Sequence, residues 1–563
     1  MSWSPRGLLP SRADVDLRPR TVRADLVAGV TVGIVALPLA LAFGASAGVG
    51  PAPGLITAVV AGIVAAVFGG SRVQVSGPTG AMAVVLAPIV ATHGPSAVPL
   101  VAILAGAIVL LAGATRLGRV VTFIPWPVVE GFTLGIATII FLQQVPAAVG
   151  VHASVGGNPL VVAIDAVAHA GASLWWALGS VAVVAAVMLV LPRFAPGLPP
   201  SLVAVVLVTT VSQLADAPLA RIGALPDSLP LPLLPTVDLG LLRALLGPAV
   251  AVAALAAIES LLSARVAAAM PTSGGAPDDD SRRYDPDREL VGQGLASIAS
   301  GAFGGMPATG AIARTAVNVR AGAQTRLAAL THSVVILGVI YLATGAVSVI
   351  PLAALAGVLM VTATRMVSVA AVRAVMMSTR ADALVLVVTA VITIAVDLIE
   401  AVQIGLLVAA FFTLRSVSRA TSVHREPLPG PAQPGDEHIA LYRLDGAMFF
   451  GAADRIGAQI RASADALVVV LRLSQLRLVD ATGAHALAEL VAALELSGVT
   501  VLVKGVQPQH LQLLTRVGVL DELRHEEHLF DDLAPALEHA RSHVARSTAA
   551  RSADTAEHQR AAS

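Results

Sequence analysis

The chain has 563 residues, of which 56% are hydrophobic and only 13% are charged, and its formal net charge is +0. A soluble domain carries roughly a quarter charged residues, so this composition excludes an ordinary soluble protein and indicates an integral membrane protein surrounded by lipid. Without a net positive charge or a basic stripe the chain offers nucleic acid no electrostatic footprint, and without Cys it has no disulfide, thiolate metal site or cysteine nucleophile.

Charges gather at the two ends of the chain, and they set the expected domain boundaries. Residues 1–23 are polar and rich in Pro, with no apolar stretch typical of a cleavable signal peptide, so we expect a cytoplasmic N-terminal segment. Residues 24–420 hold the long apolar runs of a membrane domain. After them we expect a linker at 421–437, a small cytoplasmic α/β domain at 438–542 and a disordered tail at 543–563.

The membrane domain is predicted to contain many spanning helices. Apolar windows that approach the roughly 20 residues of a membrane-spanning helix recur from Leu26 to Leu414, and they predict about fourteen spans. Arg residues cluster in alternate connections, whereas the loops near Gly48–Ala52 and Gly345–Pro351 contain no Lys or Arg. This asymmetry predicts that both chain ends lie in the cytoplasm, and hence a multi-pass protein of the inner (plasma) membrane.

Two segments are interrupted by Gly and Pro in the same manner. Val75–Met82 (VSGPTGAM) opens one apolar stretch and Met306–Ile312 (MPATGAI) opens another, and each stretch is too short to cross the bilayer by itself. Both contain Thr-Gly-Ala, with Thr79 matched to Thr309, which predicts an internal repeat of two halves. Short interrupted segments at matching positions of two halves indicate a binding site near the membrane midplane.

These segments predict an anion site made mainly of backbone. Pro near a first helical turn and small residues around it leave N–H groups free to face a cavity, and the aligned peptide dipoles add partial positive charge. Two such helix ends facing each other would hold an anion without a dedicated cationic side chain, although either motif alone is also ordinary helix-start sequence. The expected anion-binding residues are Thr79, Gly80, Ala81 and Met82 in the first segment and Thr309, Gly310, Ala311 and Ile312 in the second.

Two ionisable residues lie inside apolar segments. Glu259 interrupts a long apolar helix with Ser263 one turn away on the same face, and Arg314 lies in the second short segment. Because a charge in lipid needs a partner or water, we predict that Glu259 and Arg314 pair with each other and that Arg314 also contacts the anion. A buried carboxylate with a displaceable partner suits proton coupling, so Glu259, Arg314 and Ser263 form the predicted coupling group, with a purely structural ion pair as the alternative.

The remaining polar residues predict no further chemistry. Glu130 lies in another apolar stretch, where structural and functional roles are equally compatible with the sequence. His93, His152 and His169 fall in predicted outside loops without metal-ligand spacing, and no nucleophile and base are arranged as in an enzyme. We therefore predict no metal site, no cofactor and no enzymatic activity.

Six stretches of the chain resemble one known family. They are Val35–Gly44 (VALPLALAFG), Val75–Met82 (VSGPTGAM), Ile258–Arg265 (IESLLSAR), Glu289–Leu295 (ELVGQGL), Pro307–Gly322 (PATGAIARTAVNVRAG) and Val396–Gly405 (VDLIEAVQIG). With these stretches the chain resembles the sulfate permease family, the bacterial relatives of the animal solute carrier 26 anion transporters. The resemblance implies an inverted repeat of about seven plus seven helices with a moving core and a gate, a homodimer, an anion between the third and tenth helices, and Phe43 among the substrate-binding residues.

The chain also departs from the family pattern. Many members carry Gln where Leu39 stands, at a position thought to touch the substrate, so sulfate, bicarbonate and a dicarboxylate all stay open. The first stretch is similar to that of cyanobacterial sodium-dependent bicarbonate carriers, which bind sodium with an Asp in the position of Glu259. Those carriers have small or hydroxyl residues where Ile312 and Arg314 stand. The resemblance therefore implies that the guanidinium takes the place of sodium.

After Arg419 the sequence alternates predicted strands and helices. Its order and the Val479–Gly483 turn (VDATG) resemble the STAS domain that sulfate transporters share with anti-sigma-factor antagonists. In the antagonists a phosphorylated Ser stands where this chain has Ala481, so we expect that switch to be absent.

The sequence thus predicts secondary active transport of a small anion by alternating access, coupled to protons or working by anion exchange. The expected partners are the anion, the proton, membrane lipid and a second copy of the chain, with no nucleic acid. An anion channel with the same fold is one alternative, and saturable, coupled uptake would distinguish the two. A membrane sensor that has lost transport and signals through its C-terminal domain is another.

Overall fold

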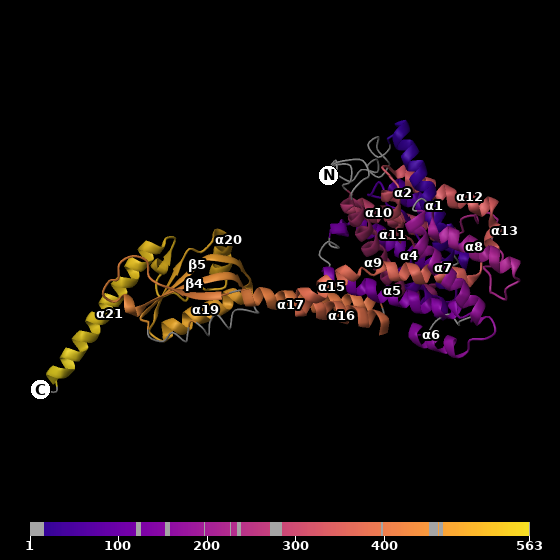
Figure 1. Cartoon of the computed structure of the whole chain (residues 1–563). Helices are drawn as coiled ribbons and strands as arrows, with labels where there is room; N and C mark the ends of the chain where they lie inside the picture. Colours follow the sequence, from indigo (N-terminus) through magenta and orange to yellow (C-terminus); the bar gives the residue numbers. More distant parts are fainter. Residues whose placement is uncertain are drawn as a thin grey trace. The chain divides into compact units, whose positions relative to one another are not determined.

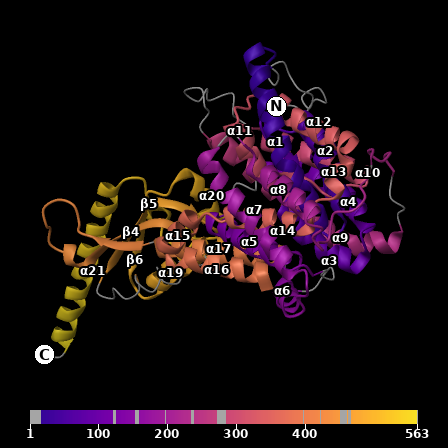
Figure 2. The same cartoon turned by 45° about the vertical axis from the view of Figure 1, so that its right-hand side comes forward.

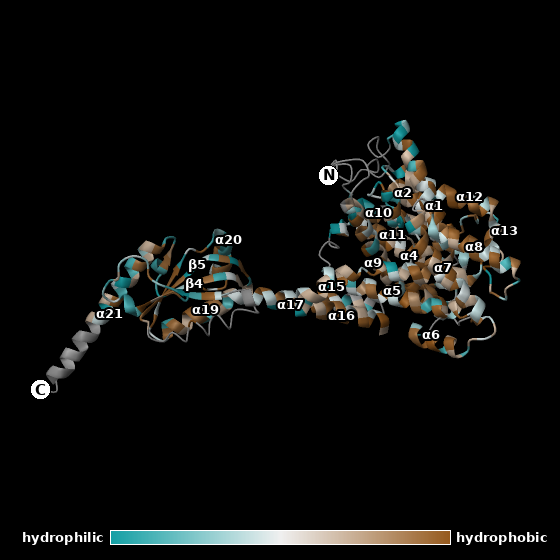
Figure 3. Cartoon of the chain, in the orientation of Figure 1, coloured by the Kyte–Doolittle hydropathy of each residue, from teal (hydrophilic) through white to brown (hydrophobic). Residues whose placement is uncertain are grey.

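The computed structural model describes residues 16–119, 125–151, 158–195, 198–225, 227–233, 238–270, 284–395, 398–420, 422–449, 460 and 466–561 (Figure 1). The chain forms two compact units, Met1–Leu406 and Leu407–Ser563, and each is described by itself. Hydrophobic residues run along the helices of the first unit, as expected for helices in lipid (Figure 3).

The described residues of the first unit form helices apart from two short strands, and several helices begin with Pro in their first two positions. The last helix continues past Leu406 into the second unit. The helices are α1 (Pro19–Ser46), α2 (Pro51–Phe68), α3 (Gly80–His93), α4 (Ala97–Ala114), α5 (Trp126–Ala148), α6 (Pro159–Ala168), α7 (Leu174–Phe194), α8 (Pro200–Leu214), α9 (Leu239–Ala269), α10 (Pro286–Ala302), α11 (Ile312–Arg320), α12 (Arg326–Leu342), α13 (Thr344–Ser348), α14 (Leu352–Met366), α15 (Val369–Ser378), α16 (Arg380–Ala395) and α17 (Leu398–Ala420). Within the described ranges, seven helices are long and apolar enough to cross a membrane, and shorter apolar helices accompany them. The shortest of the seventeen described helices are α6, α11, α13 and α15, and the expected number of about fourteen spans stays a prediction.

The helix contacts occur in equivalent pairs. Replacing each helix of a contact by its counterpart in the other half of the unit gives a second contact that is also present. α1 packs on α12 as α9 packs on α4, and α2 packs on α12 as α10 packs on α4. In the same way α5 packs on α16 as α14 packs on α7, while α5 and α14 pack on each other (Figure 2). Such matched contacts are expected when the unit consists of two equivalent halves, here α1–α8 and α9–α17. The packing therefore agrees with the internal repeat predicted from the sequence.

The two interrupted segments meet as a pair of strands. β1 (Ser76–Gly77) and β2 (Thr309–Gly310) pair antiparallel, with Ser76 opposite Gly310 and Gly77 opposite Thr309. The structure corrects the expected match of Thr79 with Thr309. Thr79 is the residue that precedes α3, whereas Thr309 lies within β2 and Ala311 precedes α11. The shared Thr-Gly-Ala letters are thus displaced by two residues relative to the helix starts.

The second unit confirms the predicted α/β domain. Its elements are β3 (Ser422–Glu426), η3 (Asp436–His438), β4 (Ile439–Met448), β5 (Val468–Val479), α19 (Ala481–Leu496), β6 (Thr500–Lys504), α20 (Pro508–Arg516), η4 (Glu526–His528), β7 (Leu529–Phe530) and α21 (Leu533–Ala561). The sheet order is β3-β4-β5-β6-β7, and all neighbours are parallel except β3 and β4. Ile439 and Leu441 pack with residues of α21, whereas Ala440 and Tyr442 pack with residues of α19, so helices cover both faces of the sheet.

Two expectations at the ends of this unit are wrong. The segment 421–437 is more than a linker, because Ser422–Glu426 forms the edge strand β3 along β4. The segment 543–563 was predicted to be disordered, but α21 continues to Ala561. The repeated Ala and Arg residues of this segment are strong helix formers, and the first turns of α21 are anchored on the sheet, so the helix continues from a fixed start.

Close packing of α2 on α10 yields a stability prediction. A Cβ added at Gly292 would lie 2.5 Å from Cα of Gly69, whereas a Cβ at Gly338 of α12 would meet nothing within 4 Å. We expect Gly292→Ala to destabilise the membrane domain by about 1–3 kcal/mol because the two backbones must separate. Gly338→Ala is the matched control and should leave the melting temperature in detergent unchanged or slightly raised. Equal melting temperatures for Gly292→Ala and wild type would contradict the observed packing.

Candidate functional site

The strand pair places two helix starts at one point inside the membrane unit. Pro78 and Thr79 connect β1 to α3, and Ala311 alone connects β2 to α11. Because the strands run antiparallel, α3 and α11 leave the pair in opposite directions, and their N-terminal ends lie at the two ends of this short strand pair. The first N–H groups of both helices, with their partial positive charge, are therefore directed toward this region.

Helix α9 supports the strand pair with hydroxyl groups. The N–H of Gly310 donates to Oγ of Ser260 at 3.0 Å, and this oxygen also lies 3.0 Å from Oγ1 of Thr309. Oγ of Ser263 donates to Oγ1 of Thr315 at 3.2 Å, and the same Thr315 oxygen accepts from the N–H of Val75 at 3.1 Å. Ser263 therefore contacts Thr315, which binds the residue before β1. The hydrogen bonds of the described residues do not include the expected contact of Ser263 with Glu259 or Arg314.

Glu259 reaches the start of α3. Oγ1 of Thr79 donates to Oε2 of Glu259 at 2.9 Å and accepts from the N–H of Met82 at 3.4 Å, so one hydroxyl both caps α3 and holds the carboxylate. Glu259 is half-buried and lines a small cavity of about 50 Å³. The cavity lies between α9 and α5 and is lined by Val128, Val129, Phe132, Thr133, Ile136, Ile258, Glu259, Leu262, Ile312 and Met366.

Arg314 lies buried beside the end of β1, with 2% of its surface exposed. Its Nη2 donates to the backbone carbonyl of Pro78, and its Nη1 has no hydrogen-bond partner among the described residues. Among the described residues no ion pair within 4.0 Å joins Arg314 to Glu259, although each charge acts on the other electrostatically. The two charges instead contact successive residues, because the carbonyl of Pro78 binds the guanidinium and the hydroxyl of Thr79 binds the carboxylate.

The other predicted binding residues lie near the start of α3 or the start of α11. A Cβ added at Gly80 would lie 3.1 Å from Cε1 of Phe43, so Phe43 of α1 packs directly on the start of α3. Ala81 and Met82 are fully buried, and the N–H of Met82 donates to Oγ1 of Thr79. Ile312, the first residue of α11, is 37% exposed and faces the cavity of Glu259. The structure thus brings Phe43, Thr79, Gly80, Ile312 and the two charges to one region.

Several residues of this region escaped the sequence analysis. Nε2 of Gln293 donates to Oγ of Ser76 at 2.6 Å and to Oε1 of Glu289 at 2.9 Å, so α10 also holds β1. Ser260 and Thr315 were also missed. The available signal was the presence of polar residues within apolar helices, where each one needs a partner.

Two further polar residues of the sequence analysis are Glu130, whose role was left open, and His152, expected in an outside loop. Glu130 accepts a 2.9 Å hydrogen bond from Nε1 of Trp126, one turn earlier on α5, which favours its structural role. His152 lies outside the described residues.

The fold and the site define a class: a multi-pass helical membrane protein built from two equivalent halves, with two broken helices that meet inside it, followed by an α/β domain. Comparison with known protein families identifies two matching regions. Residues 22–389 match the sulfate permease family, and residues 431–536 match the STAS domain. The chain belongs to the sulfate permease family, which is a family of transporters and not of enzymes.

Relatives and solved structures agree with this assignment. The chain is 33% identical over 521 residues to the putative sulfate transporter YvdB of Bacillus subtilis, covering 90% of this chain and 96% of the relative. It is 30% identical over 500 residues to the bicarbonate transporter BicA of Picosynechococcus, covering 83% and 86%. The fold matches the murine Slc26a9 anion transporter with a TM-score of 0.82 at 17% identity over 95% and 94% of the two chains. The transmembrane domain of a cyanobacterial BicA matches with a TM-score of 0.59 at 31% identity, covering 70% of this chain and 98% of that one.

The double role of Thr79 can be tested without any transport assay. Thr79→Val removes both the cap of α3 and the donor to Glu259, and we expect a loss of stability of about 1–3 kcal/mol. Thr79→Ser keeps the hydroxyl and is the matched control, which should melt within a degree or two of wild type in detergent. If Thr79→Val melts like Thr79→Ser, the hydroxyl does not hold the helix start.

Proposed function

We propose that the protein is a secondary active transporter of a small anion that works by alternating access. The anion would bind between the N-terminal ends of α3 and α11, near Phe43, Arg314 and the backbone of Thr79–Met82 and Thr309–Ile312. The observation that carries the proposal is the guanidinium of Arg314, which is buried in a membrane unit with one nitrogen left without a partner where two positive helix ends meet.

Two cavities lie along the boundary between the helices that hold the proposed anion site and the helices α5 and α14. One is the cavity of Glu259 along the first half of α5. The other, of about 210 Å³, lies at the opposite end of α5, where Ala42 and Ser46 of α1 face Gln143 and Gln144 of α5 and Leu352 of α14. Both cavities separate α5 and α14 from the helices that hold the site. We infer that α5 and α14 belong to the gate and that α1, α3, α9 and α11 belong to the moving core.

The coupling mechanism follows from the fixed charge of Arg314. Since a guanidinium stays protonated, it supplies permanent positive charge, and sodium would find no net negative site beside it. Glu259 faces a cavity that water can enter, so we infer that it takes up a proton as the anion arrives. Transport is then anion–proton symport, with anion exchange as the second mode, and it needs no sodium.

The substrate class comes from the relatives. Those named above as sulfate and bicarbonate transporters favour a small oxyanion, and Leu39 leaves the first helix without a polar substrate contact. Uptake of labelled sulfate, bicarbonate and succinate into proteoliposomes identifies the anion. Saturable uptake with counterflow would exclude both a channel and a transport-inactive sensor. We further infer a homodimer in the plasma membrane with both chain ends in the cytoplasm.

The proposed anion-binding site can be tested at Ile312. Its side chain already lines the cavity of Glu259, so a polar replacement need not disturb the core. We expect Ile312→Glu to reduce uptake at least about tenfold, because an ionised carboxylate raises the energy of an anion nearby by more than 1.4 kcal/mol. Ile312→Gln has nearly the same shape without the charge and should retain most of the activity. Size-exclusion chromatography checks that both variants fold. Equal uptake by the two variants would contradict the proposed seat.

Proton coupling can be tested at Glu259. Glu259→Gln keeps a hydrogen-bonding partner for Thr79 but cannot titrate, so we expect it to retain anion exchange and to lose the acceleration of uptake by an inwardly directed pH gradient. Wild-type uptake should respond to that gradient equally in sodium and in potassium buffers. Strictly sodium-dependent wild-type uptake that ignores the pH gradient would show that Arg314 does not replace the coupling ion.

A further inference from the structure

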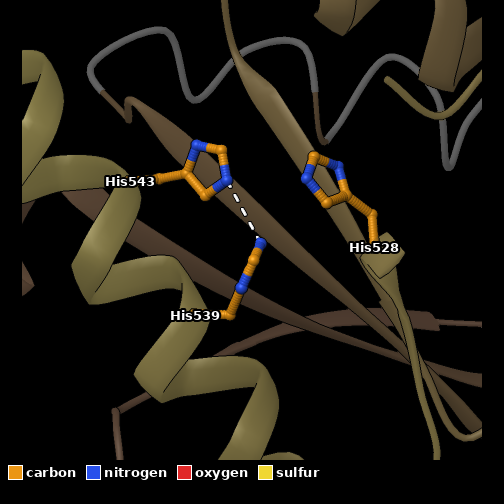
Figure 4. A group of neighbouring side chains, drawn as sticks. All are labelled: His528, His539 and His543. Atoms are coloured by element: carbon orange, nitrogen blue, oxygen red, sulfur yellow. Dashed lines mark hydrogen bonds between the residues drawn. The ribbon is translucent and has the colours of Figure 1, made fainter. Parts of the chain in front are cut away.

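Three histidines of the C-terminal domain share one small space. His528 ends η4 directly before β7, and His539 and His543 lie one turn apart on α21. One ring nitrogen from each residue lies within 4.8 Å of one from each of the others. Figure 4 shows the three rings turned toward a common region between the helix and the strand.

The spacing of the two helix residues suits a metal ion. Nε2 of His539 and Nε2 of His543 are 3.2 Å apart. Two imidazole nitrogens bound to one tetrahedral zinc ion are roughly 3.3 Å apart, because each Zn–N bond is about 2.0–2.1 Å long. The i, i+4 spacing also places both rings on one face of α21. These two ligands need little movement to share an ion.

His528 supplies the independent observation. It is buried, with 1% of its surface exposed, and neither of its ring nitrogens has a hydrogen-bond partner among the described residues. A hydrogen bond between His539 and His543 explains the contact of those two rings, but it leaves His528 unsatisfied. Buried polar groups in folded proteins normally have a partner, so an ion at the shared point would complete the arrangement.

The surroundings hold the three ligands in place. Ala536, Leu537, Ala540 and Val544 anchor α21 on the sheet, and Arg541 forms an ion pair with Asp436 at 2.8 Å. The three rings therefore lie between elements that are fixed by packing of α21 on the sheet.

We propose that His528, His539 and His543 form a binding site for one divalent transition metal ion of the zinc type, which joins the C-terminal helix to the turn before β7. Three imidazoles are ligands that Zn²⁺, Ni²⁺ and Cu²⁺ accept, and they leave a fourth position for water or another ligand. The membrane unit is not part of this site, so the proposal does not depend on the transported anion.

The test uses the full-length protein in detergent, purified without a histidine tag and treated with a chelator. Zinc is added, unbound metal is removed, and bound metal is counted by mass spectrometry. Co²⁺ serves as a spectroscopic probe, because its visible absorption reports the coordination geometry. Wild type should bind one strong equivalent, and His543→Ala and His539→Ala should each lower the affinity by at least about tenfold.

Two further variants make the test decisive. His485→Ala removes an exposed histidine of α19 outside the cluster and should bind metal like wild type. His528→Ala removes a buried ligand and is compared by its thermal shift, since zinc should raise the melting temperature of the C-terminal domain in wild type and not in this variant. Equal zinc binding by wild type, His539→Ala and His543→Ala, or no binding by wild type at micromolar zinc, would overturn the proposal.

Discussion

The membrane unit depends on one constraint: backbone N–H and C=O groups buried in a membrane must find partners within the protein. Helices α3 and α11 begin inside the unit, so the chain before each of them cannot satisfy its backbone within a helix. The antiparallel pair of Ser76–Gly77 with Thr309–Gly310 solves this problem by joining the two interruptions to each other. The hydroxyl of Ser260 on α9 accepts from the N–H of Gly310, and the hydroxyl of Thr315 on α11 accepts from the N–H of Val75. The amide of Gln293 on α10 donates to the hydroxyl of Ser76.

The same solution creates the proposed binding region. Joining the two interruptions brings two helix N-termini to one point, and their partial positive charges add. Arg314 and Glu259 are tied to the connection between β1 and α3 through Pro78 and Thr79. Thr79 links the state of the carboxylate to the start of α3, because its hydroxyl serves both. A change in the charge of Glu259 would therefore act directly on the helix that is proposed to bind the anion.

Much of this could be predicted from the sequence. Apolar windows and the matched interruptions predicted the helical membrane domain, its two halves and the segments that meet, because burial in lipid restricts which residues can occur. The register of the repeat was mispredicted, since Thr-Gly-Ala recurs by letter but stands at different places relative to the two helix starts. The sequence also shows the two opposite charges of Glu259 and Arg314 but not the groups that contact them, which are the hydroxyl of Thr79 and the carbonyl of Pro78.

In the C-terminal domain the alternation of strands and helices predicted the fold. The histidine cluster was not predicted, since His528 reaches His539 and His543 only through the packing of α21 on the sheet. The i, i+4 pair on α21 was the one signal available beforehand. The anion seat itself stays a proposal, because the residues around it are mostly backbone and its occupant is not defined by any side-chain motif.

An anion is proposed to bind where the ends of α3 and α11 meet. The most direct measurement is a pair of cryo-electron microscopy maps of the protein, one free of anion and one saturated with the anion that its own uptake assay identifies. We expect extra density within hydrogen-bonding distance of the backbone N–H groups of Gly80 and Ala81 and near Ile312, beside Arg314. Extra density at another place in the membrane unit, with this point unchanged between the two maps, would contradict it.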